Sequence, residues 1–98
     1  LGRRLLVFGA LKDKDWGQML EILLPAFAAA ILCRPPSDRA ADPEMLLGTA
    51  RGLCHHVEVV PEVPDALAAA RALARPEDTI LVTGSLFTAG AALAALGA

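Results

Sequence analysis

The sequence predicts an α/β fold, namely a Rossmann-like parallel sheet of about four strands with helices on both faces. Short aliphatic runs alternate with stretches in which apolar residues recur at helical spacing, which is typical of βαβ units. Runs such as LLVF and ILVT are apolar throughout, as strands buried on both faces of a parallel sheet must be. The 98 residues are 55% hydrophobic and 20% charged, so residues 1–98 are expected to form a single domain with its own core.

The first predicted strand is residues 5–8, and the helix after it is expected to end near Leu24. Pro25 lacks a backbone donor, so it ends or kinks that helix. The apolar residues of this helix share one face, and we expect them to be core. They are Trp16, Met19, Leu20, Leu23 and Leu24.

The second predicted pair is a strand at residues 30–33 and a helix that begins after Asp42. The Asp42 side chain can cap a helix, and Pro43 suits the first helical position. The helical pattern continues to Leu53.

Two more strand and helix pairs complete the pattern. Residues 57–60 are a predicted strand, and Pro64 opens a helix that stops before Pro76. Residues 79–83 form the fourth predicted strand, and Ser85 caps a last helix whose leucines we also expect to be core. The apolar and small residues on one side of this helix are Leu86, Ala89, Gly90, Leu93 and Leu96. The order of the strands in the sheet does not follow from the sequence.

Composition argues against several functional classes. The net charge is −2 with scattered Lys and Arg, so we expect no nucleic-acid partner. No uncharged stretch approaches the roughly 20 residues that span a bilayer, and no secretory cleavage site follows the first apolar run. We therefore expect no membrane association and a cytoplasmic location, with Cys33 and Cys54 reduced.

Cys54, His55 and His56 suggest a metal site, but adjacent histidines in an extended segment point in opposite directions. No second ligand pair at zinc spacing is present, so we expect a solvated turn and no metal. Cys33 ends an apolar strand and is best interpreted as a small buried hydrophobe.

Ligands of open parallel sheets bind beyond the carboxyl ends of strands, which selects residues 9–16, 34–39 and 83–88. Gly84 allows a ligand to approach the backbone, and Ser85 either only caps the helix or also donates to a carboxylate. The sequence here is neither a Walker A motif, a dinucleotide fingerprint nor a hydrolase elbow.

Basic residues near these strand ends are further candidates for anion binding. Lys12 and Lys14 precede a helix whose N-terminal field disfavours cations, which weakly favours a role in meeting an anion. Arg34 and Arg39 lie in a proline-rich loop and can clamp a carboxylate or phosphate, although surface arginines are common.

Four segments, in order, resemble the C-terminal domain of the folylpolyglutamate synthase/dihydrofolate synthase family of the Mur ligase superfamily. They are LVFGALKDKDWGQML, ILCRPPSDRAADPEML, VEVVPEVPDALAAA and ILVTGSLFTAGAAL. The resemblance implies a domain of an ATP-dependent ligase that forms an acyl phosphate on a folate or dihydropteroate carboxylate, which the amino group of glutamate then attacks. It also implies that Lys14 and Ser85 hold the glutamate carboxylate, and Thr83 and Arg34 complete the predicted substrate-binding set.

The chain departs from the family pattern because the first strand and its Asp-Gly-Ala-His-Asn type of loop are absent. We therefore expect a truncated domain that lacks its first βα unit and the preceding catalytic domain, and that is inactive alone. ATP and Mg are expected in the full-length enzyme, and no cofactor is expected in this fragment. A missing strand would leave an exposed sheet edge that promotes self-association.

Two alternatives stay open, a domain of a peptidoglycan Mur ligase and a non-enzymatic Rossmann-like module that binds an anion or a partner protein. The glutamate interpretation requires that the peptides after Phe8 and after Val82 emerge side by side at one edge of the sheet.

Overall fold

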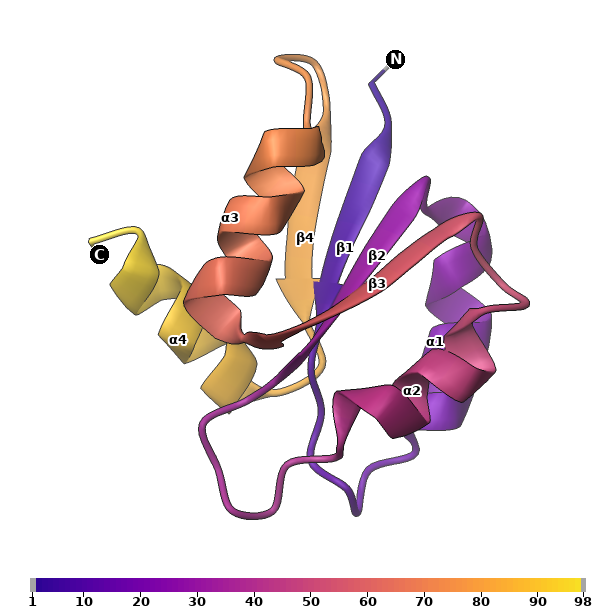
Figure 1. Ribbon diagram of the computed structural model, residues 1–98, viewed down its shortest axis with the longest axis vertical. Coiled ribbons are helices and arrows are strands. Elements are labelled where there is room, and N and C mark those ends of the chain that lie inside the picture. The colour runs from indigo at the N-terminus through magenta and orange to yellow at the C-terminus, as the bar shows by residue number, and fades with distance from the viewer. Residues whose placement is uncertain (1, 98) are drawn as a thin grey trace.

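Four parallel strands form one twisted sheet in the order β3-β2-β1-β4 in the computed structural model, which describes residues 2–97 (Figure 1). The strands are β1 (Arg4–Phe8), β2 (Ala29–Arg34), β3 (His56–Glu62) and β4 (Thr79–Thr83). Phe8 at the end of β1 lies opposite Leu32 of β2 on one side and Thr83 of β4 on the other. The predicted fold class is therefore confirmed, and the structure supplies the strand order.

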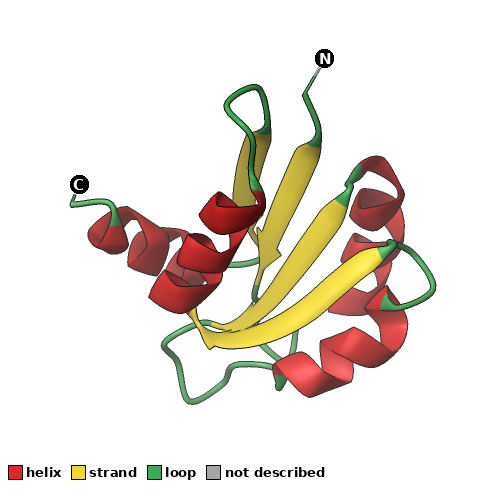
Figure 2. Cartoon of the chain, turned by 45° about the horizontal axis from the view of Figure 1, so that its top comes forward, coloured by secondary structure: helices red, strands yellow, loops and turns green. Residues whose placement is uncertain are grey.

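Helices cover both faces of the sheet (Figures 1 and 2). On one face, α1 (Trp16–Leu23) and α2 (Pro43–Ala50) pack on Leu6 and Phe8 of β1 and on the matching side chains of β2. On the other face, α3 (Val63–Leu73) and α4 (Leu86–Ala95) pack on Val7 and on Ile31. The alternation of strand side chains between two cores explains why β1 and β2 are apolar at nearly every position. The predicted burial of the ILVT run on both faces is wrong, because β4 is an edge strand and Leu81 is 42% exposed.

The helix signals in the sequence act locally as predicted. The carboxylate of Asp42 accepts a hydrogen bond from the Glu44 backbone N–H at 3.0 Å, and Ser85 Oγ accepts one from the Thr88 N–H at 3.1 Å. Pro25 ends α1 by placing Leu24–Ala26 in a short 3-10 turn. The second helix stops at Ala50, short of the predicted Leu53, which follows in a turn.

The predicted inner side of α4 is wrong. Leu86, Leu93 and Leu96 are 91%, 54% and 55% exposed, and the side that packs inward carries the small residues Thr88 and Ala92. The segment is apolar on nearly every side, so its leucines do not define which side faces the sheet. The first helix follows the prediction, because Leu20 and Leu24 are buried and the three other apolar residues pack against them.

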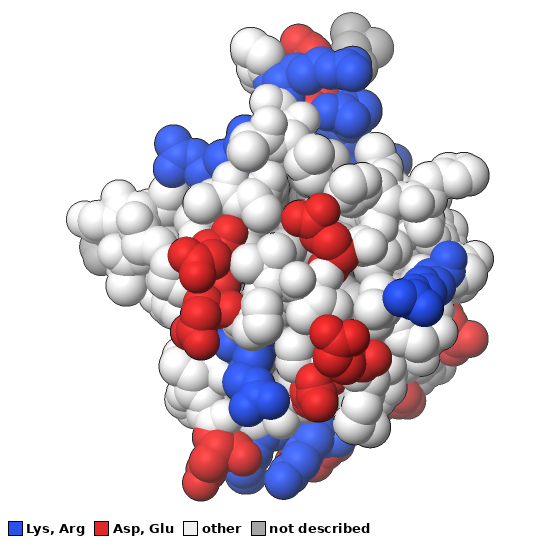
Figure 3. Space-filling view, viewed as in Figure 1, with Lys and Arg blue, Asp and Glu red and all other residues white. Residues whose placement is uncertain are grey.

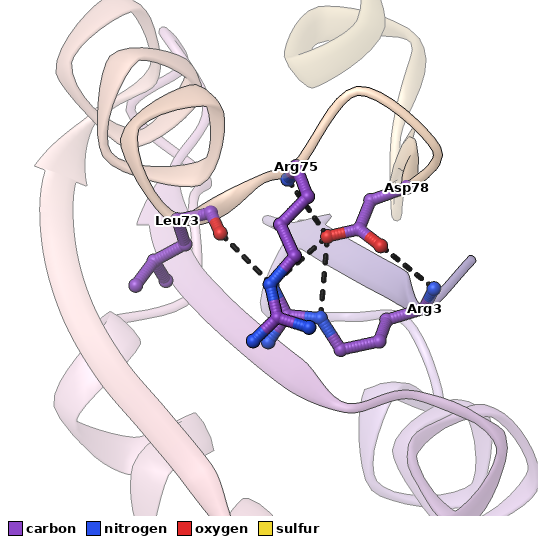
Figure 4. Close-up of polar contacts among 4 residues, drawn as sticks. All are labelled: Arg3, Leu73, Arg75 and Asp78. Carbon is purple, nitrogen blue, oxygen red and sulfur yellow. Dashed lines mark hydrogen bonds and ion pairs between the residues drawn. The ribbon is translucent and has the colours of Figure 1, made fainter.

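A polar contact ties the amino ends of β1 and β4 together (Figure 4). The Asp78 carboxylate accepts hydrogen bonds from the Arg75 backbone N–H at 2.9 Å and from the Arg3 backbone N–H at 2.8 Å. The Arg3 guanidinium pairs with the same carboxylate at 2.9 Å and also donates to the Leu73 carbonyl. The Arg75 N–H, followed by the Arg3 groups, lowers the pKa of Asp78 to about 2, although burial opposes the shift.

Charged residues of both signs are interspersed on the face of the molecule shown in Figure 3. No helix within residues 2–97 combines the length and apolarity needed to cross a bilayer.

Candidate functional site

The loops that follow β1 and β4 leave the sheet side by side. The last residues of these strands, Phe8 and Thr83, are paired, and the Gly9 N–H continues the pairing by donating to the Thr83 carbonyl at 3.3 Å. The common edge that the glutamate interpretation requires is thus confirmed.

Two glycines allow these loops to touch through their backbones. Gly84 has φ of +112°, and a Cβ atom placed on it would lie 2.3 Å from the Gly9 carbonyl oxygen. A Cβ atom on Gly9 would in turn lie 2.8 Å from the Cys33 carbonyl oxygen and 3.0 Å from Thr88 Oγ1. A side chain at position 84 would push the two loops apart, and one at position 9 would collide with Cys33 of β2 and with Thr88 of α4.

Hydroxyl groups link the same two loops. Thr88 Oγ1 donates to the Gly9 carbonyl at 2.8 Å and lies 3.0 Å from Ser85 Oγ. Ser85 is therefore a helix cap, as predicted, and also the outer member of a hydrogen-bonded chain that reaches the loop after β1. Sequence reasoning missed Thr88 because a threonine inside an apolar helix carries no pattern that names its partner.

Lys14 and Ser85 line a common pocket of about 480 Å³ at the carboxyl end of the sheet. The pocket also has apolar walls and a glycine, which come from Leu11, Met19, Gly84, Leu86 and Phe87. The exposed Lys14 makes no ion pair with any residue between 2 and 97, so its charge is available to a ligand.

The loop that carries Lys14 is held by backbone hydrogen bonds. The Lys14 N–H donates to the Leu11 carbonyl at 3.1 Å, and the Lys12 N–H donates to the Arg39 carbonyl at 2.8 Å. Leu11 is buried and forms an isolated antiparallel bridge with Ala40. The loop after β2 therefore positions Lys14 through main-chain contacts.

The two other predicted site residues lie apart from the walls of this pocket. Thr83 contributes its carbonyl to the β1 and β4 pairing and is not a lining residue. Arg34 lines a separate cavity of about 200 Å³ with residues of the β2 loop, Glu62 at the end of β3, the start of α3 and Ala91 of α4. The structure thus brings Lys14 and Ser85 together but does not bring Arg34 to them.

No group of three potential metal ligands occurs within residues 2–97. His56 Nε2 lies 2.9 Å from Glu58 Oε2, and the Cys54 thiol donates to the Phe27 carbonyl at 3.3 Å. Cys33 is fully buried, and this burial raises the pKa of its thiol to about 12. A thiol with so high a pKa carries almost no thiolate at neutral pH and is a poor nucleophile.

The parallel sheet, the two touching strand-end loops and the pocket at their edge define a Rossmann-like α/β domain. The sequence profile of the family described as "Mur ligase, glutamate ligase domain" matches residues 1–86. The chain belongs to this family.

Two curated relatives are similar to the chain. A probable bifunctional folylpolyglutamate synthase/dihydropteroate synthase from Haloferax volcanii is 42% identical over 83 residues, which are 84% of this chain and 10% of the relative. A protein of the same description from Halobacterium salinarum is 41% identical over 86 residues, which are 87% of this chain and 10% of the relative. The chain thus spans about a tenth of these relatives.

Solved structures show the same fold. E. coli FolC in complex with DHPP and ADP matches 99% of this chain and 22% of its own, with a TM-score of 0.89 and 31% identity. Mycobacterium tuberculosis folylpolyglutamate synthase complexed with ADP and AMPPCP matches 98% of this chain and 24% of its own, with a TM-score of 0.87 and 31% identity.

Proposed function

We propose that this chain is the glutamate-binding domain of a cytoplasmic, ATP-dependent folylpolyglutamate synthase type of ligase. The single observation that carries the proposal is the pocket in which Lys14 and Ser85, from two different strand-end loops, meet. The similarity to proteins named folylpolyglutamate synthase supports glutamate and a folate as substrates of the full-length protein.

The residues of this chain would position glutamate for attack on an activated carboxylate held elsewhere in the protein. The Lys14 ammonium would neutralise a glutamate carboxylate, and the free N–H groups at the start of α4 would add hydrogen bonds. The apolar walls, including Leu11 and Met19, would limit access of water to this charge pair. Positioning of this kind can lower a barrier by several kcal/mol because the reactants are already oriented.

Residues 2–97 show no motif or ligand cluster of their own that would hold ATP or Mg. No Walker A sequence is present, and no three potential metal ligands lie together within residues 2–97. We therefore propose that a preceding domain of the full-length protein holds ATP and Mg together with the folate. It follows that the isolated chain should form no ADP when it is mixed with ATP, glutamate and a folate.

The test replaces Lys14 with alanine in the full-length protein and measures glutamate-dependent ADP release. A charged hydrogen bond contributes about 1.5–3 kcal/mol, so the KM for glutamate should rise by about 10- to 150-fold while the KM for ATP stays nearly constant. Lys12→Ala is the matched control, because Lys12 lies in the same loop but does not line the pocket. An unchanged KM for glutamate in Lys14→Ala would contradict the assignment of Lys14 to the glutamate site.

The same protein separates the two alternatives. Glutamate-dependent ADP release with a nucleotide-sugar acceptor, and none with a folate, would favour a cell-wall Mur ligase. Absence of ADP release with either acceptor would favour a binding module without ligase activity.

A further inference from the structure

Among residues 2–97, Thr88 is the only polar residue that is buried as a whole, with 0% exposure. The Asp78 side chain is also buried, but it lies at the opposite end of the sheet and pairs with Arg3. The Thr88 hydroxyl bonds the Gly9 carbonyl, a partner 79 positions away in the sequence. Burying a hydroxyl costs free energy unless it is hydrogen-bonded, and a valine would fill the same space without that requirement. The position of Thr88 between the two ligand loops suggests why a polar group is placed there.

The direction of each hydrogen bond follows from simple counting. The Gly9 carbonyl can only accept, so the single hydroxyl proton of Thr88 points to it. The 3.0 Å contact between Ser85 Oγ and Thr88 Oγ1 then requires Ser85 to donate. Ser85 Oγ at the same time accepts from the Thr88 backbone N–H at 3.1 Å. Both the rotamer and the proton of Ser85 are thus held by Thr88.

We propose that Thr88 is a positioning residue for the pocket, an inference that rests on the proposed glutamate site. Its hydroxyl fixes the spacing of the loop after β1, which carries Lys14, from the loop after β4, which carries Ser85. It also holds the Ser85 hydroxyl in one orientation until a ligand carboxylate competes for its proton. Thr88 itself lies behind Ser85 and does not line the pocket.

The test compares Thr88→Val, Thr88→Ser and the remote control Thr49→Val in the full-length protein. Thr88→Val keeps the shape of the side chain but removes both hydroxyl contacts, so the KM for glutamate should rise by about 3- to 10-fold, with the KM for ATP unchanged. Thr88→Ser keeps the hydroxyl and should restore the KM. Thr49 lies in α2, away from the pocket, and its substitution should leave both KM values unchanged.

The rate of amide hydrogen exchange at Gly9 reports on the contact between the two loops and does not depend on catalysis. The Gly9 N–H bonds the Thr83 carbonyl, so its exchange should become faster in Thr88→Val and return to the wild-type rate in Thr88→Ser. If Thr88→Val does not fold, Thr88→Ala takes its place, because alanine sets no methyl group against the Gly9 carbonyl.

The two proposals fail in different ways. A wild-type glutamate KM and wild-type exchange at Gly9 in Thr88→Val, with Lys14→Ala still impaired, would overturn the role of Thr88 alone. A full-length protein that shows no glutamate-dependent activity would overturn the proposed function. In that case the exchange at Gly9 would still decide whether Thr88 sets the loop spacing.

Discussion

Replacing Gly84 with alanine should destabilise the domain strongly, because two separate costs fall on this residue. Its φ of +112° lies in a region that residues with a side chain rarely adopt, at a cost of about 1–3 kcal/mol. The new Cβ would also lie 2.3 Å from the Gly9 carbonyl oxygen, which is a backbone atom that no side-chain rotation can move.

Relief of this overlap requires that Gly9 moves away from Gly84. Gly9 would then weaken its bonds to the Thr83 carbonyl and to the Thr88 hydroxyl, each worth about 1 kcal/mol. The summed loss is about 3 kcal/mol or more, which corresponds to a fall in Tm of at least about 12 °C for a domain of this size.

Urea denaturation and thermal unfolding of the chain measure this effect, with Gly90→Ala as the matched control. Gly90 lies in the middle of α4 with no atom within 4 Å of an added Cβ, so alanine there should stabilise by about 0.5–1 kcal/mol. A Gly84→Ala variant within about 1 kcal/mol of the wild type would refute the argument that the two loops touch through their backbones.

Three further outcomes are expected. Leu20→Ala should lower the free energy of unfolding in urea by about 3 kcal/mol, since Leu20 is fully buried. Ile22→Ala in the same helix should lower it little, because Ile22 is 71% exposed. Equal losses of stability in the two variants would contradict the assigned buried face of α1. Asp78 has its pKa lowered from 3.8 to about 2, so the stability it contributes is present above about pH 4 and is lost as the pH falls toward 2. Asp78→Asn should therefore flatten the plot of unfolding free energy against pH in this range. An unchanged slope would exclude the Asp78 carboxylate as the source of the pH dependence. A thiol reagent at pH 8 should modify the half-buried Cys54 in the folded chain but should modify Cys33 only after urea unfolds the chain, because the buried Cys33 thiol has a pKa of about 12. Rapid labelling of Cys33 in the folded chain would show that this thiol is accessible to solvent.

Local signals in the sequence predicted most of the fold. The caps Asp42 and Ser85 act within their own helix turns, so the residues next to them suffice to identify them. The aliphatic runs predicted every strand, and the runs of β1 and β2 are the most apolar because these strands are buried on both faces, whereas the edge strands β3 and β4 are only partly covered. Helices and strands that are marked by neighbouring residues could thus be predicted from the sequence.

Features that depend on contacts between residues far apart in the sequence could not be predicted from the sequence. Periodicity could not choose the inner side of α4, because the helix is apolar on nearly every side and its inward-facing Thr88 bonds Gly9, a residue far away in the sequence. For the same reason the sequence predicted Ser85 as a helix cap and site residue but did not identify Thr88 as its hydrogen-bond partner. The family resemblance implied that Lys14 and Ser85 act together, and the rule that loops of parallel strands share an edge placed their loops side by side but not their side chains.

The contact between Gly9 and Gly84 has a consequence for how relatives of this domain can diversify. The two loops beside the pocket meet through main-chain atoms, which substitutions at other positions retain, whereas the pocket is lined by side chains such as Leu11 and Phe87. Exchange of these lining residues can alter the shape and polarity of the pocket while the main-chain contact between the two loops is retained.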